Sequence, residues 1–122
     1  MKYLIVLFLL GYFLADYSLV VSETLPDIKT YSIHKTMDRW GGGQWTYLND
    51  LIYRESNWKH TAKNPKSSAY GIGQFLTSTW KTVGCEKTDD PYRQIDCMLD
   101  YIELRYKTPE SALKFHQKKN WY

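Results

Sequence analysis

Glu55 is the residue whose type and position carry the clearest chemical potential in this sequence. Leu48, Leu51 and Ile52 recur at the i, i+3, i+4 spacing of one helix face, and Glu55 is the i+7 member of that face. Burial on an apolar face disfavours the charged carboxylate, so we expect a raised pKa for Glu55. A carboxylic acid that stays protonated near neutral pH can give its proton to a leaving oxygen, as glycoside cleavage requires. The pattern leaves a second interpretation open, in which Glu55 turns to solvent or pairs with Arg54 or a lysine.

A second carboxylate that would assist Glu55 has no good candidate. Most glycosidases pair the acid with another carboxylate, which acts as nucleophile or base. The candidates considered are Asp89, Asp90 and Asp100. Asp90 is better explained as a helix cap, and Asp100 falls off the apolar stripe of its helix, which favours solvent exposure. The sequence therefore indicates a single acid.

Other chemistries find little support. His34, His60 and His116 are scattered without the spacing of a metal site, and no paired-cysteine motif occurs. No Gly-x-Ser-x-Gly turn presents a serine nucleophile. The net charge of +3 is mild, and acidic residues are interspersed along the chain. We expect no metal, no cofactor and no nucleic-acid partner.

The element that carries Glu55 is expected to be a helix that begins near Gln44, after the glycine run 41–43. The segment 57–70 contains Asn-Pro and Ser-Ser pairs and is expected to be a loop. Gly71-Ile72-Gly73 then indicates a tight chain path with little side-chain bulk.

Three further helices are expected after this loop. A short one is expected at about 77–83. Asp90-Pro91 and Thr108-Pro109 each combine an N-cap residue with proline at the first helical position, so each predicts a helix start. The apolar bulk of Trp121-Tyr122 indicates a docked end. The predicted fold class is mainly α, with about four helices and at most a small turn or hairpin near Gly71.

The first residues have the layout of a targeting segment. Lys2 precedes an uncharged, mostly aliphatic run over 4–15, and a second apolar run over 17–21 follows. A signal peptide cleaved after Ser22 fits this layout, and an uncleaved membrane anchor within 1–22 is the alternative. In both cases the rest of the chain is expected outside the cytoplasm.

The remainder is expected to form a linker over 23–31 and one domain over 32–122. An even cysteine count in an exported chain favours a disulfide between Cys85 and Cys97, worth about 3 kcal/mol in the chain-entropy model. Two free buried thiols are the alternative.

The aromatic content of 16% suits either a small core or a sugar-binding cleft. Trp58, Tyr70, Phe75 and Trp80 could stack on sugar faces, but core positions are the default interpretation for them. Lys63 and Lys66 flank the loop and are interpreted as solvated residues.

An ordered set of motifs surrounds and follows Glu55. Glu55-Ser56 at the expected helix end is followed by the segment Ser67-Ser68-Ala69-Tyr70-Gly71-Ile72-Gly73-Gln74. The later members of the set are Gln94-Ile95, Tyr101-Ile102, Arg105-Tyr106 and Trp121-Tyr122. Over roughly residues 44–122 the set resembles the lytic transglycosylases, the soluble-lytic-type domain of the lysozyme superfamily. Many members of the family have Leu-Met before the glutamine, whereas this chain has Ile72-Gly73, which the phage and actinobacterial branch also uses.

The resemblance implies a small helical, lysozyme-like fold and roles for the matching residues. Glu55 would be the sole catalytic acid and base, and Ser56 would orient it or the acetamido group of the substrate. Gln74 would hydrogen-bond the sugar, and Tyr101 would stabilise the reacting ring. Gly71 would let the backbone approach the glycan closely, as would Gly73.

The reaction implied by the resemblance cleaves the β-1,4 bond between N-acetylmuramic acid and N-acetylglucosamine in peptidoglycan and leaves a 1,6-anhydromuramoyl end. Two alternatives stay open: a muramidase that hydrolyses the same bond, and a non-catalytic peptidoglycan-binding module. We expect a monomer whose partner is the glycan strand.

Overall fold

The structure, a computed structural model, describes residues 24–122. The predicted signal peptide or anchor at 1–22 lies outside the described residues. The described part is mainly helical, as predicted, and has the character of a small lysozyme-like domain. Its helices are α2 (Ile28–Trp40), α3 (Trp45–Ser56), α4 (Thr77–Thr82), α5 (Pro91–Tyr106) and α6 (Pro109–Lys119).

The two proline-marked helix starts are confirmed. The Asp90 side chain accepts a hydrogen bond from the backbone N–H of Tyr92 at 2.9 Å, and Pro91 begins α5. The Thr108 hydroxyl accepts from the N–H of Ser111, and Pro109 begins α6. These starts were predictable because the capping residue and the proline are neighbours in sequence.

The helix α2 was not predicted, so the expected count of about four helices was one too low for the described residues. Asp27 caps it by accepting from the N–H groups of Lys29 and Thr30, and the helix therefore overlaps the linker predicted at 23–31. Its fully buried side chains are Ser32 and Thr36, whose hydroxyls donate to backbone carbonyls one turn earlier. Because polar residues form the buried face, the usual apolar stripe is missing.

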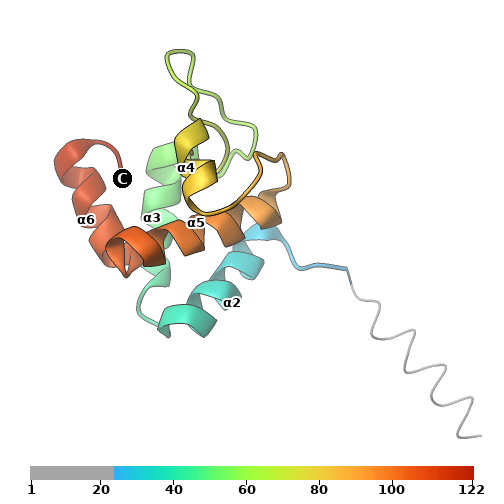
Figure 1. Ribbon diagram of the computed structural model, residues 1–122. Helices are drawn as coiled ribbons and strands as arrows, with labels where there is room; N and C mark the ends of the chain where they lie inside the picture. The colour runs from blue at the N-terminus through green and yellow to red at the C-terminus, as the bar shows by residue number, and fades with distance from the viewer. Residues whose placement is uncertain (1–23) are drawn as a thin grey trace, which may run out of the picture.

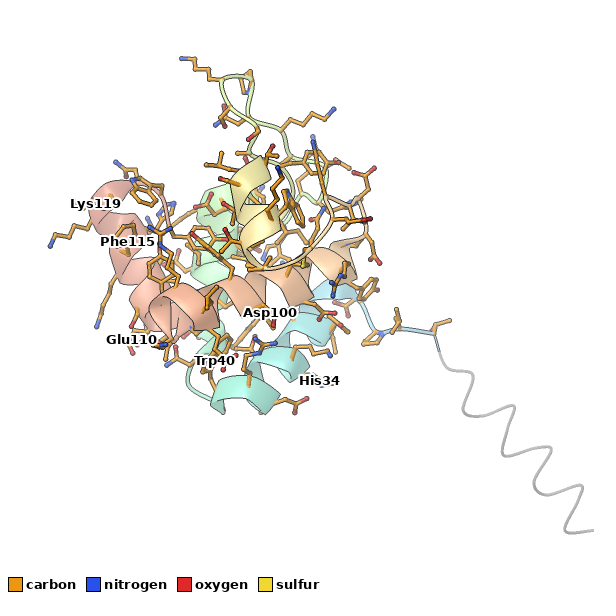
Figure 2. The ribbon with its side chains drawn as sticks, viewed as in Figure 1. His34, Trp40, Asp100, Glu110, Phe115 and Lys119 are labelled. Atoms are coloured by element: carbon orange, nitrogen blue, oxygen red, sulfur yellow. A yellow bond between two sulfur atoms is a disulfide. The ribbon has the colours of Figure 1, made fainter. Side chains whose placement is uncertain are left out.

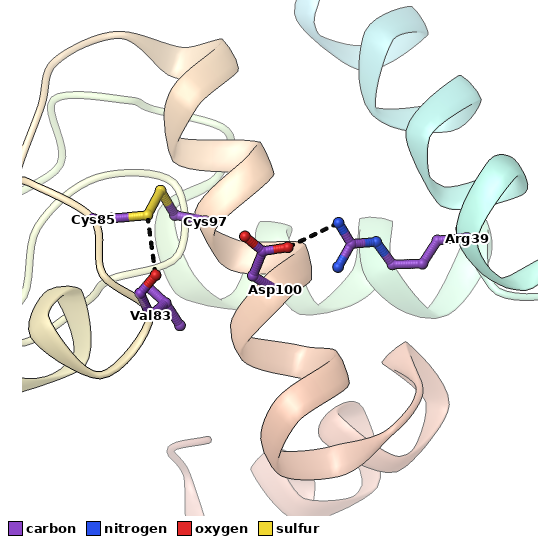
Figure 3. Close-up of a disulfide and its surroundings, with 5 residues drawn as sticks. All are labelled: Arg39, Val83, Cys85, Cys97 and Asp100. Carbon is purple, nitrogen blue, oxygen red and sulfur yellow. Dashed lines mark hydrogen bonds and ion pairs between the residues drawn. A yellow bond between two sulfur atoms is a disulfide. The ribbon is translucent and has the colours of Figure 1, made fainter.

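The long helix α5 runs through the middle of the fold, as Figure 1 shows. It contacts α2, α4 and α6, and α3 packs against α6. Arg39 on α2 pairs with Asp100 and Glu103 on α5, at 2.9 and 2.8 Å (Figure 3 shows the first pair). Asp100 is half exposed, as predicted. The shared core is formed mainly by residues of α3 and α5, among them Leu48, Leu51, Ile52, Ile95, Met98, Leu99 and Ile102.

The predicted disulfide between Cys85 and Cys97 is confirmed (Figure 3). It fastens the segment after α4 to the middle of α5. Cross-linking a loop of this size stabilises the fold by about 3 kcal/mol in the chain-entropy model. The bond thereby fixes the turn that carries α4 onto the central helix.

The segment between α3 and α4 is a loop with two isolated antiparallel bridges, Lys63 to Tyr70 and Tyr70 to Phe75. This agrees with the small turn expected near Gly71. Tyr70, Phe75 and Trp80 are buried, which confirms the core interpretation for these three aromatic residues. Within residues 24–122, no helix combines the length and apolar character needed to cross a bilayer.

Candidate active site

A cavity of about 330 Å³ opens where the end of α3, the loop before α4, the middle of α5 and the last residues of the sequence meet. Its lining includes Glu55, Gly73, Gln74, Tyr101, Trp121 and Tyr122. The structure thus gathers residues almost seventy positions apart into one hollow.

Glu55 occupies the last turn of α3, just before Asn57 ends the helix in the left-handed conformation. Its side chain is 13% exposed. Burial raises the pKa of Glu55 to about 7, because the charged form loses hydration there. This agrees with the expectation from its apolar helix face. The alternative pairing with Arg54 is wrong, since Arg54 pairs with Asp50 at 3.0 Å.

His116 on α6 is the partner of Glu55. Its Nε2 lies 2.8 Å from Glu55 Oε1, and its side chain is 12% exposed. Burial lowers the pKa of His116, and the nearby positive charge of Arg54 lowers it further. Sequence reasoning missed this contact because one histidine in a polar helix gives no local signal of what α6 packs against.

Gln74 and Tyr101 both line the cavity with Glu55. Gln74 adopts a positive φ of 50°, and its Nε2 donates to the carbonyls of Ala62 and Gly71. The Tyr101 ring is 4% exposed, and its hydroxyl accepts a hydrogen bond from Arg105. The structure therefore brings four of the six sequence-predicted site residues to one cavity, with Gly73 as the fourth.

Ser56 and Gly71 are not part of that lining. Ser56 lies about 100° around the helix axis from Glu55, as any next neighbour in a helix does, and its hydroxyl is 3.4 Å from the Ile52 carbonyl. Gly71 has φ of +82°, and a Cβ there would lie 2.8 Å from the Gln94 side chain. Gly71 thus makes the turn that supports the cavity wall.

Tyr122 and Trp121 also line the cavity, although the sequence predicted only that this end would be docked. The Tyr122 hydroxyl donates to the Gly73 carbonyl at 2.9 Å, and its ring packs against Tyr101. Trp121 is half exposed at the cavity, with the guanidinium of Arg105 over its ring. The last two residues therefore form part of the cavity wall.

A comparison with known protein families matches residues 33–115 to the Transglycosylase SLT domain, which is more than half of the 122 residues. The chain belongs to this family. No match was found among curated proteins, and none among solved structures. The matched segment of the SLT domain includes Glu55, Gln74 and Tyr101, whereas His116, Trp121 and Tyr122 lie beyond its end.

Two further features limit the chemistry of this SLT domain. Among the described residues, Glu55 is the single aspartate or glutamate side chain that lines the cavity. No three His, Cys, Asp or Glu residues within 24–122 are grouped as a metal site would need, and His34 lies on α2, remote from α6 (Figure 2). The site therefore offers one carboxylic acid, with aromatic and amide groups around it.

Proposed function

We propose that this SLT domain is a peptidoglycan lytic transglycosylase. It cleaves the β-1,4 bond between N-acetylmuramic acid and N-acetylglucosamine and forms a 1,6-anhydromuramoyl end. The observation that carries the proposal is one acidic side chain in the cavity lining, Glu55, with its pKa raised to about 7 and no second aspartate or glutamate in the lining described. Near neutral pH a substantial fraction of a carboxyl group with this pKa is protonated and can donate its proton.

One carboxyl group is sufficient for the proposed reaction. Glu55 gives its proton to the glycosidic oxygen as the bond from that oxygen to C1 of the muramic ring breaks, and the neighbouring acetamido group supports C1. The Glu55 carboxylate then takes the proton of the 6-hydroxyl as O6 bonds to C1. The proton count of Glu55 is restored, and no water is consumed.

The other lining residues receive supporting roles in this proposal. The Gln74 amide and the Tyr101 ring bound the cavity beside Glu55, where they contact the sugar. Trp121 offers a half-exposed indole face, a surface on which a pyranose ring stacks. Ser56 and Gly71 act indirectly, through the end of α3 and the turn before Gln74.

The decisive experiment digests purified sacculi with the protein and measures product masses. Anhydro-muramoyl products are expected, and products heavier by one water would identify a hydrolytic muramidase instead. Glycan binding without any turnover by the folded protein would identify a non-catalytic module.

The variant Glu55→Gln tests the acid directly. Loss of a positioned general acid is expected to reduce the rate by about 100-fold or more. Glu110→Gln is the matched control, because the Glu110 side chain pairs with Lys114 away from the cavity lining, and the substitution keeps the backbone N–H that donates to Gln44. Activity of Glu55→Gln near that of the control, with an unchanged circular dichroism spectrum, would remove Glu55 from the role.

A substrate in the cell wall implies action outside the cytoplasm, so we further propose that residues 1–22 direct export. N-terminal sequencing of the exported protein distinguishes cleavage after Ser22 from retention as an anchor. We also propose that the protein acts as a monomer, which sedimentation analysis tests.

A further inference from the structure

In the contact between His116 and Glu55, the surroundings of the imidazole determine which group donates the hydrogen bond. His116 Nε2 lies 2.8 Å from Glu55 Oε1, while His116 Nδ1 is buried and has no hydrogen-bond partner. Glu55 lines the cavity, and His116 is not among its lining residues, so the imidazole approaches the carboxyl group from the protein side.

A neutral imidazole carries one proton, on Nδ1 or on Nε2. A proton on Nδ1 would be a buried N–H donor without an acceptor, which folded proteins rarely tolerate. With the proton on Nε2, Nε2–H donates to Glu55 Oε1. The buried Nδ1 is then an acceptor without a donor, which folded proteins tolerate better than a buried N–H without an acceptor. The hydrogen bond made by one ring nitrogen thus selects the tautomer.

We propose that His116 is a positioning residue that donates Nε2–H to Glu55 Oε1 and thereby places the acidic proton of Glu55 on Oε2, the oxygen left for the cavity. This inference rests on the proposed function, because it assigns His116 a part in the same reaction. His116 transfers no proton itself. Its hydrogen bond strengthens as Glu55 becomes a carboxylate, since hydrogen bonds to charged groups are stronger than neutral ones.

The imidazole must be neutral for this role, because a cation beside Glu55 would favour the carboxylate and leave less of the protonated form that donates the proton. Burial and the charge of Arg54 both lower the pKa of His116, and Asp50 opposes them. Arg54 and Asp50 form an ion pair on α3, so their effects partly cancel. The other elements around the site contribute the side chains of Tyr101, Tyr106 and Tyr122 and the positive charge of Arg105.

Two variants separate positioning from a merely structural role. His116→Phe keeps an aromatic ring but removes the donor, whereas the amide of His116→Gln can replace Nε2–H. For His116→Phe we expect kcat to fall by about tenfold to a hundredfold with little change in KM, as loss of orientation does. The alkaline limb of its pH profile should move up by about one pH unit, because the Glu55 anion loses its donor. His116→Gln should restore most of both.

Gln117→Ala serves as the control, since Gln117 is exposed on the same helix. A His116→Phe protein that melts like the wild type and retains its kcat and alkaline limb would overturn the inference. A wild-type protein that does not turn over sacculi would instead overturn the proposed function.

A readout that needs no activity completes the test. Nitrogen-15 NMR of the protein, with His116 assigned through its variants, is expected to show a neutral ring with the proton on Nε2 at pH 7. The signal should shift in Glu55→Gln. A proton on Nδ1, or a cationic ring at that pH, would contradict the proposed geometry.

Discussion

Gln94 and Glu55 are both polar side chains removed from most of the solvent, but their hydrogen bonds differ. Gln94 is 2% exposed, and its amide is fully paired. Its Oε1 accepts from the N–H of Ile72, and its Nε2 donates to the carbonyls of His60 and Thr88. These bonds tie the loops on both sides of α4 to α5. A buried amide satisfied in this way contributes to stability and has little capacity left for a ligand.

The cluster around Glu55 is paired incompletely. Glu55 has His116 as its partner, His116 Nδ1 has none, and the neighbouring Tyr106 hydroxyl is also buried without one. Leaving polar atoms unpaired inside a protein is unfavourable. The comparison shows that the unfavourable unpaired polar atoms lie around Glu55, whereas Gln94 pairs the loops that shape the cavity.

The largest effect on stability is expected from Gln94→Leu. Three backbone groups lose their partner, so we expect a loss of about 3–5 kcal/mol in the free energy of unfolding. Urea denaturation measures it, with the exposed Gln117→Leu as control. A loss below about 1 kcal/mol would mean that water replaces Gln94 and that the comparison fails.

Glu55→Gln is expected to act in the opposite direction. Because the folded pKa of about 7 lies above the ordinary glutamate value of 4.5, the folded protein holds the proton more tightly than the unfolded chain. Stability from this group is complete below pH 4.5 and is lost as the pH rises through 7. Glutamine does not ionise, so the variant should exceed wild type by about 2–3 kcal/mol at pH 8 and match it near pH 4.

Melting curves at the two pH values test this expectation. The depressed pKa of His116 lowers stability toward acid in both proteins, and therefore largely cancels from the difference. An equal difference at both pH values would show that ionisation of Glu55 is not its cause.

Gly71→Ala is expected to lower the free energy of unfolding by about 2 kcal/mol. The new Cβ would sit 2.8 Å from the paired Gln94 amide, at a φ of +82° that side chains adopt at a cost of about 1 kcal/mol. Gly42→Ala is the matched control, because a Cβ there meets nothing within 4 Å. Equal unfolding midpoints for the two variants would show that the turn adapts.

The smallest expected change in stability compares two tyrosines near Glu55, Tyr122 and Tyr106. Tyr122→Phe loses a hydrogen bond to the Gly73 carbonyl and should cost about 1 kcal/mol. Tyr106→Phe removes a hydroxyl that has no partner, so it should be neutral or stabilising by up to about 1 kcal/mol. Chemical denaturation of both proteins shows whether the hydrogen bonding of the hydroxyl determines the sign of the change in the free energy of unfolding.

Local signals explain what the sequence predicted correctly. The caps at Asp90 and Thr108 are made within three residues, and the apolar face of α3 is continuous, so both could be recognised without the fold. The helix α2 was missed because Ser32 and Thr36 occupy its buried face, where side-chain to backbone hydrogen bonds replace apolar character.

The site was predictable as far as one helix and the family motifs reach. Glu55, Gln74 and Tyr101 were found in this way, and all three line the cavity. His116 was not, because its contact depends on how α6 packs against α3, and the two residues are far apart in sequence. Gly71, named by the same motif, lies behind the cavity rather than in its lining, because its turn packs against Gln94.

The packing of α6 against α3 means that Glu55 keeps its proton near neutral pH only in the folded protein. Helix α3 alone would leave this carboxyl group in water, with the ordinary pKa of a glutamate and too few protons at neutral pH to act as an acid. The raised value belongs to the folded domain, in which α6 packs against α3 and buries most of the carboxyl group together with its other neighbours. Under the proposed function, activity should therefore be lost together with the α3–α6 contact, in a single cooperative step, so that a chain not yet folded is inert toward the glycan.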